Sequence, residues 1–249
     1  MSGQVLEIRG LCKDYPAFHL KDVSFSVGRG RIMGFIGRNG AGKTTVLKSL
    51  LRIVHPDAGD VRFFGMDIIG HERQIKQRIG YAGGAVDFYR RKKIADILSV
   101  TRSFYPNWDE AACRRCLDAF SLDTAKTPRQ LSEGMRVKFS LTLALSHHAE
   151  LLILDEPTSG LDPVSREELL DTFTFLRDQG VAVLFSTHIT SDLEKCADDI
   201  AYIAAGRLLA AGTMADFLTA NADRGGTLED IMISYEKENV YEKLAEKRA

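Results

Sequence analysis

A glycine-rich loop over residues 37–45, Gly-Arg-Asn-Gly-Ala-Gly-Lys-Thr-Thr, is the sequence feature that most constrains how this chain can fold. It fits the pattern of a glycine, four residues, a glycine, a lysine and a serine or threonine, which forms a phosphate-binding loop. Residues 31–36 before it read as a short buried strand, and residues 46–54 after it carry apolar side chains at helical spacing. Strand, glycine loop and helix in this order predict a nucleotide-binding α/β domain.

Each residue type in the loop has a physical role in holding phosphate. Glycines let the backbone turn tightly and bring its N–H groups close to phosphate oxygens, and the start of a helix adds its dipole. Lys43 can reach the β- and γ-phosphates, Thr44 can offer its hydroxyl to Mg²⁺, and Thr45 can add a hydrogen bond. The candidate nucleotide-binding residues are Gly37, Arg38, Asn39, Gly40, Ala41, Gly42, Lys43, Thr44 and Thr45. The alternative is a glycine-rich turn with a chance lysine, and the loop alone fits kinases, GTPases, helicases and transport motors alike.

Two acidic residues follow a second strand. Residues 151–154 form a continuous apolar run, typical of buried parallel strands, and the run ends in Asp155 and Glu156. Open α/β sheets bind ligands at the carboxyl ends of their strands, so Asp155 can hold Mg²⁺ and Glu156 can polarise the water that attacks the γ-phosphate. His188 follows another buried strand, residues 181–185. It can bond the γ-phosphate, although a histidine after a strand is often structural.

Three other positions add polar or aromatic candidates. Ser132 suits the N-cap of a strong helix, and with Gly134 it places helix N–H groups where they can meet an anion. Tyr15 precedes Pro16 in a predicted loop, where it can stack on an adenine ring or close a hairpin. His147 and His148 end the Ser132 helix, and we interpret both as solvated.

Composition narrows the classes of protein. The chain has 249 residues, 45% of them hydrophobic and 27% charged, and a formal net charge of −1, so no global basic field attracts nucleic acid. No apolar stretch approaches the roughly 18 to 20 residues that span a bilayer, and the N-terminus lacks the apolar core of a signal peptide. We therefore expect a cytoplasmic chain. Cys113 and Cys116 form a C-x-x-C with no second pair, which favours reduced thiols over a redox or metal role.

Taken in order, these pieces resemble the nucleotide-binding subunit of an ABC transporter over residues 4–235. Residues 37–45 match the Walker A motif, 151–156 match Walker B, and 159–162 match the D-loop. Residues 131–135, Leu-Ser-Glu-Gly-Met, resemble the signature Leu-Ser-Gly-Gly-Gln, and this signature separates the family from other phosphate-loop enzymes. His188 matches the switch histidine and Tyr15 the adenine-stacking aromatic. The LSxGM form is similar to that of a bacterial exporter-like branch.

The resemblance implies a fold and a set of partners. The fold is α/β: a P-loop NTPase core with a parallel sheet, an antiparallel β subdomain and an inserted helical subdomain over about residues 86–148. The domain spans residues 1–235, and residues 236–249 form a charged C-terminal tail after a last helix at 227–235. ATP and Mg²⁺ would lie between Lys43 of one subunit and Ser132 and Gly134 of another, in a homodimer or heterodimer. A separate transmembrane permease would hold the pair at the inner face of the membrane.

One departure from the family pattern leaves a second hypothesis. The family places a glutamine, or sometimes a glutamate, about three residues after the tyrosine of Ile-Gly-Tyr, where this chain has Gly84. Asp87 is a poor substitute because it would need a loop shift. From the other motifs, the chain is expected to be an ATP hydrolase that powers a transporter. The alternative is a hydrolysis-impaired switch that binds ATP beside an active partner. A soluble relative acting on ribosomes or DNA is a third reading, disfavoured by the near-neutral charge.

Overall fold

The structure is a computed structural model that describes residues 3–83 and 89–246. Ten strands in this part of the chain form one sheet with the order β5-β4-β1-β2-β10-β9-β3-β8-β7-β6. The strands are β1 Gln4–Tyr15, β2 Phe18–Gly28, β3 Ile32–Ile36, β4 Ala58–Phe63, β5 Met66–Asp67, β6 Ile79–Ala82, β7 Leu151–Asp155, β8 Ala182–Thr187, β9 Asp199–Ala204 and β10 Arg207–Thr213. The helices are α1 Lys43–Leu50, α2 Ile68–Lys76, α3 Ile94–Arg102, α4 Glu110–Ala119, the 3-10 helix η1 Pro128–Gln130, α5 Glu133–Ser146, α6 Pro163–Asp178, α7 Thr190–Cys196, α8 Met214–Ala220 and α9 Leu228–Glu246.

The sheet has a parallel part and an antiparallel part. Strands β6, β7, β8, β3 and β9 pair in parallel, and every residue of β3, β7 and β8 is buried. Their continuous apolar sequences follow from burial on both faces. Strands β1, β2 and β4 are antiparallel, as are β9 and β10. This arrangement confirms the predicted α/β class.

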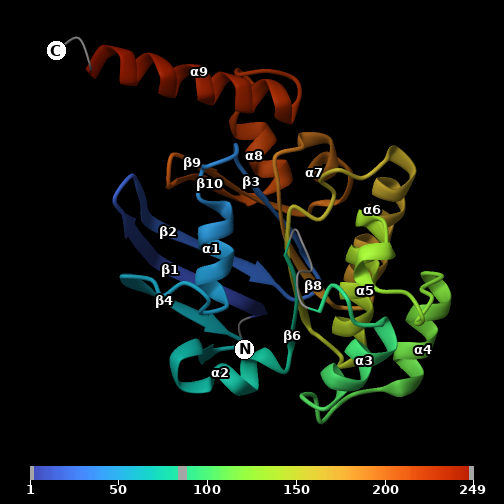
Figure 1. Cartoon of the computed structure of the whole chain (residues 1–249). Helices are drawn as coiled ribbons and strands as arrows, with labels where there is room; N and C mark the ends of the chain where they lie inside the picture. Colours follow the sequence, from blue (N-terminus) through green and yellow to red (C-terminus); the bar gives the residue numbers. More distant parts are fainter. Residues whose placement is uncertain (1–2, 84–88, 247–249) are drawn as a thin grey trace.

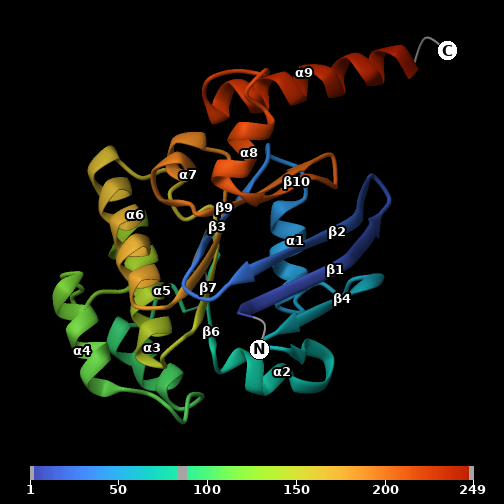
Figure 2. The same cartoon turned by 180° about the vertical axis from the view of Figure 1, so that it is seen from behind.

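Helices cover the sheet from both sides (Figures 1 and 2). Helix α1 packs Val46, Leu47 and Leu50 into a core shared by the antiparallel strands and one face of the parallel strands. Helices α5 to α9 contribute to a second core on the other face, where Phe173 of α6 lies against Phe185 of β8 with ring centroids 5.5 Å apart. The two layers hold the carboxyl ends of β3, β7 and β8 at one edge of the sheet.

Residues 94–146 form the inserted helical subdomain that the fold class predicted. Its small core includes Ile94, Ile97, Leu131 and Phe139. Helix α5 joins it to the sheet, because Phe139 and Leu143 face this core while Leu141 and Ala144 belong to the sheet core. Ser132 caps α5 as predicted, with its Oγ accepting a bond from Met135 N at 3.3 Å.

Three sequence expectations are wrong. Tyr15 lies at the end of strand β1, paired with β2, and not in the predicted loop, while Pro16 lies in the turn. Helix α9 runs to Glu246 instead of ending at Tyr235, since the charged segment is rich in the helix formers Glu and Lys. His147 is buried, not solvated. Among the described helices, none has the length and apolar character needed to cross a bilayer.

Candidate functional site

The phosphate loop connects β3 to α1 and depends on its glycines. Gly40 and Gly42 have φ values of 82° and 112°, in the left-handed region. A Cβ added at Gly42 would lie 2.8 Å from the ring of Phe18, and one at Gly37 would lie 2.3 Å from the carbonyl oxygen of Ile203. The backbone is therefore packed too closely for other side chains. It leads directly into the first turn of α1, where amides lack an acceptor one turn back.

Lys43 is a buried cation at the centre of the loop. Its side chain is 5% exposed, and its Nζ donates to the carbonyl oxygens of Gly37 at 2.6 Å and Arg38 at 3.3 Å. The third contact of Nζ is with Glu156 Oε1 at 3.0 Å. A buried ammonium needs a negative partner, so in this structure the Glu156 carboxylate takes the place that a phosphate oxygen can fill.

Asp155 and Glu156 lie at the end of β7 and share one serine. Ser186 Oγ donates to Asp155 Oδ1 at 2.6 Å and accepts from Glu156 N at 3.0 Å. Glu156 has a φ of 53°, an uncommon conformation for a residue other than glycine. A carboxylate only accepts, so His188 Nδ1 donates to Glu156 Oε2, at 2.9 Å. The structure thus brings Lys43, Glu156 and His188 together from three separate segments.

A cavity of about 630 Å³ follows the loop from Tyr15 to Glu156. Tyr15 ends β1, pairs with Phe18 across the turn and is 37% exposed. It therefore closes the hairpin, which was one of the two predicted alternatives, and it also lines the cavity. The other lining residues are Ala17, Phe18, Arg38, Asn39, Gly40, Gly42, Lys43, Thr44 and Thr45. The volume is typical of sites for small ligands and cofactors.

The residues present fit a triphosphate with Mg²⁺. Thr44 lines the cavity and Asp155 is held by Ser186 at its edge. Within the described ranges no group of three or more His, Cys, Asp or Glu side chains could hold a metal. A site with one carboxylate and one hydroxyl suits Mg²⁺, which keeps several waters and binds phosphate oxygens rather than a cage of protein ligands.

Ser132 and Gly134 lie elsewhere in the chain. Neither lines the cavity along the glycine loop. Ser132 is exposed at the start of α5, whereas Gly134 is buried, and a Cβ there would lie 3.5 Å from Ser165 and 3.6 Å from Leu161. Gly134 thus lies close to Leu161 and Ser165 of its own chain, and Ser132 is exposed to solvent. The Gly84 and Asp87 positions lie outside the described residues.

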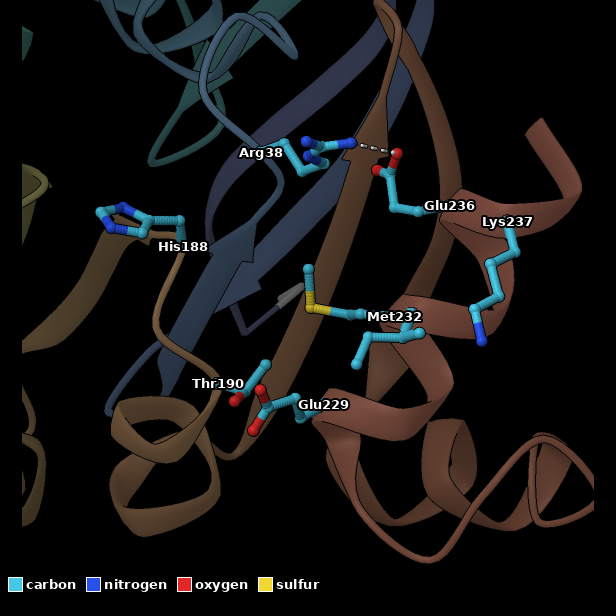
Figure 3. A pocket seen from close by; sticks show the side chains of 8 residues that line it. Arg38, His188, Thr190, Glu229, Met232, Glu236 and Lys237 are labelled. Atoms are coloured by element: carbon cyan, nitrogen blue, oxygen red, sulfur yellow. Dashed lines mark hydrogen bonds and ion pairs between the residues drawn. The ribbon is translucent and has the colours of Figure 1, made fainter. Parts of the chain in front are cut away.

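A second cavity of about 510 Å³ lies beside the loop and was not expected from the sequence (Figure 3). It is bounded by Arg38, by His188 and Thr190 after β8, and by the α9 residues Glu229, Met232, Ile233, Glu236 and Lys237. Arg38 Nη1 lies 3.4 Å from Glu236 Oε2, although the two residues are 198 positions apart. Nothing in the local sequence pattern signals a contact over this separation.

His147 is the clearest case of a misread side chain. It is 3% exposed and stacks on Tyr105 with ring centroids 3.9 Å apart, and its Nδ1 lies 3.2 Å from the carbonyl oxygen of Gln77. Burial lowers the pKa of His147 to about 4, so the ring is neutral at pH 7. His148, whose side chain is 62% exposed, does fit the expectation.

Comparisons with known proteins point to one family. A family model described as "ABC transporter" matches residues 20–159. The "ABC transporter ATP-binding protein YtrB" of Bacillus subtilis is 31% identical over 80% of this chain and 68% of its own length. The "Bacitracin transport ATP-binding protein BcrA" of Bacillus licheniformis is 33% identical over 75% of this chain and 62% of its own length. A solved structure described as "Structure of ATP binding subunit of ABC transporter" has a TM-score of 0.82 and 28% identity, covering 92% of this chain and 98% of that one.

Proposed function

The chain belongs to the ABC transporter ATP-binding family, and we propose that it binds and hydrolyses ATP to power a transporter whose membrane-spanning part is a separate chain. The observation that carries this proposal is the assembly of Lys43, Glu156 and His188 beside the glycine loop. A buried lysine supplies positive charge to a triphosphate, and a carboxylate oriented by a histidine can polarise water. Both are parts of the phosphoryl-transfer template.

Each residue of the site has a separate role in the proposed reaction. Tyr15 stacks on the base, and the loop amides with Lys43 hold the β- and γ-phosphates, which stabilises the charge that develops during transfer. Glu156 orients the attacking water, and His188 keeps that carboxylate in place through the 2.9 Å bond. Thr44 and Asp155 are the residues that would hold Mg²⁺, which neutralises phosphate charge when bound.

We infer that the complete site needs a second subunit. Ser132 caps an exposed helix start and is absent from the cavity lining of its own chain, yet the N-terminus of a helix favours anions. Ser132 and Gly134 of a second copy, or of a related subunit, would close over the γ-phosphate. Ser132→Arg should remove ATP-dependent dimerisation while ATP binding to the monomer remains. Light scattering with ATP in the Glu156→Gln background measures this, and a dimer that persists in Ser132→Arg would contradict the arrangement.

The proposal also includes a role in transport. Two relatives carry names that describe bacitracin transport and daunorubicin resistance, and this chain spans 62% and 68% of their lengths. The partner we expect is a transmembrane permease that holds this chain on the inner face of the membrane. Affinity capture from detergent-solubilised membranes should recover an integral membrane chain with this subunit. Recovery of ribosomal or DNA-associated proteins in its place would contradict the transporter assignment.

Phosphate release by the purified chain with MgATP separates the hydrolase from the hydrolysis-impaired switch. We expect steady turnover that is lost in Lys43→Ala. Binding of ATP without turnover, alone and at concentrations that allow dimers, would favour the switch. Among the described residues no contact specifically supports the switch, and the hydrogen bond between His188 and Glu156 is one that a hydrolase would use.

A further inference from the structure

Arg38 is shared by two cavities. It is the second residue of the glycine loop, and it lines both the nucleotide cavity and the neighbouring cavity against α9. Its side chain is 68% exposed, and its Nη1 lies 3.4 Å from Glu236 Oε2 (Figure 3). Arg38 thus belongs to the loop that is proposed to hold the phosphates, yet its guanidinium is paired with a carboxylate from the C-terminal helix.

Glu236 is the anchored member of this pair. Its side chain is only 22% exposed, and its Oε1 accepts a bond from the hydroxyl of Tyr202 at 3.3 Å. Tyr202 is fully buried on β9, and burial, with the nearby Glu236 carboxylate, raises the pKa of its hydroxyl, which keeps it a donor. Leu228 and Ile231 fix the start of α9 in the sheet core. The Glu236 carboxylate is held by the buried Tyr202, whereas the more exposed Arg38 guanidinium can move away from Glu236.

We propose that Glu236 is a positioning residue that withholds the Arg38 guanidinium from the nucleotide, and that ATP competes with Glu236 for it. This proposal rests on the proposed binding of ATP at Lys43. A guanidinium makes the same forked bonds to phosphate as to carboxylate, and a triphosphate carries more negative charge than one carboxylate. When ATP occupies the loop, Arg38 moves to the phosphates and leaves Glu236 with Tyr202 alone.

Because Glu236 lies on α9, the proposed movement of Arg38 from Glu236 to the phosphates would affect this helix. Among the described side chains of α9, Tyr235 is the last that packs on the sheet core, and the C-terminal part of the helix projects past the body (Figures 1 and 2). The contact between Arg38 and Glu236 thus joins the phosphate loop to the place where the helix leaves the core. ATP binding removes this contact and loosens α9, so the C-terminal helix responds to the nucleotide.

A mutant cycle on nucleotide affinity tests the competition. ATP binding is measured by calorimetry with EDTA, which prevents turnover, for the wild type, Glu236→Gln, Arg38→Ala and the double variant. Removing the competing carboxylate should tighten ATP binding about two- to fivefold, the range expected for one partly exposed ion pair. In the Arg38→Ala background the same change should have less than about half of this effect on a logarithmic scale. The matched control is Glu229→Gln, a carboxylate of α9 that lines the same cavity, which should leave the affinity unchanged.

Two results would overturn the proposal. One is an unchanged or weaker affinity in Glu236→Gln, and the other is the same tightening with and without Arg38, which would mean simple charge repulsion. Hydrogen exchange gives a second readout: amides at residues 232–237 should exchange faster when ATP binds the wild type, but not Arg38→Ala. Equal ATP affinity in the wild type and Lys43→Ala would instead refute the proposed function, and this inference with it. Loss of binding in Lys43→Ala with no effect of Glu236→Gln would refute this inference alone.

Discussion

Replacing Glu156 by glutamine isolates its negative charge, because the two side chains have nearly the same shape. In the structure this carboxylate contacts Lys43 Nζ at 3.0 Å and His188 Nδ1 at 2.9 Å. The neutral amide of a glutamine cannot polarise water as a base, and general-base catalysis contributes about 10² to 10⁴-fold to a rate. We therefore expect the turnover of Glu156→Gln to fall by about that factor, measured as phosphate release under saturating MgATP.

The same substitution has an effect on binding and stability. ATP affinity should be retained or tightened, because the neutral side chain no longer competes with phosphate for Lys43. Without nucleotide, Lys43 keeps its bonds to the Gly37 and Arg38 carbonyls but loses its negative partner. Glu156 is 22% exposed, so we expect a loss of about 1 to 2 kcal/mol, below the range for fully buried pairs. This corresponds to a Tm lower by about 2 to 8 °C, which added ATP should recover.

A matched control and a refuting result complete the test. Glu168 also pairs with a lysine, Lys138, at 2.6 Å, but on the exposed side of α6. Glu168→Gln should leave turnover within about twofold, as surface pairs contribute little. Unchanged turnover in Glu156→Gln would remove Glu156 from the role of water activator. Loss of ATP binding in the same variant would show that the carboxylate serves the nucleotide directly and not the water.

Three further perturbations probe other parts of the chain. Lys43→Ala should weaken ATP binding by about 10- to 100-fold in calorimetry, the value of a charge-assisted bond, whereas Lys48→Ala at the far end of α1 should not. Tyr15→Ala should weaken it by about 5- to 100-fold through lost stacking, and Tyr15→Phe should change it little; equal losses in both would exclude stacking. His147 has a folded pKa of about 4, below the unfolded value near 6.5, so its stability contribution is complete above pH 6.5. Urea unfolding should show up to about 3 kcal/mol lost as the pH falls from 6.5 to 4, and His147→Leu but not His148→Ala should remove this dependence.

The features of this protein that could be predicted from the sequence are those that depend on residues close together in the chain. The glycine loop, the apolar run before Asp155 and the Ser132 cap are local patterns, and the structure places each at the expected end of a strand or helix. Because parallel strands end at one edge, the approach of Lys43, Glu156 and His188 could also be expected.

The sequence predictions are wrong where residues distant in the chain determine the local structure. His147 is buried by Tyr105 and by the Gln77 carbonyl, 42 and 70 positions away, which no helical periodicity reveals. Tyr15 was expected in a loop because Pro16 follows it, although pairing with β2 keeps the chain extended up to Tyr15. Glu236 was assigned to a charged tail, since its partners Arg38 and Tyr202 lie far upstream.

The contacts of Lys43 link the proposed binding and hydrolysis of ATP through charge alone. Lys43 is 5% exposed, and its buried charge requires a negative partner whether or not phosphate is present. Here that partner is Glu156, so under the proposed function the water-activating carboxylate is neutralised by the cation that would bind ATP. An arriving phosphate takes over Lys43 and releases one carboxylate oxygen, while His188 still holds the other. Water activation therefore becomes available only once the phosphate to be attacked is in place. The pair of Arg38 and Glu236 follows the same principle, since a carboxylate neutralises a cation of the loop until, as we propose, phosphate takes its place.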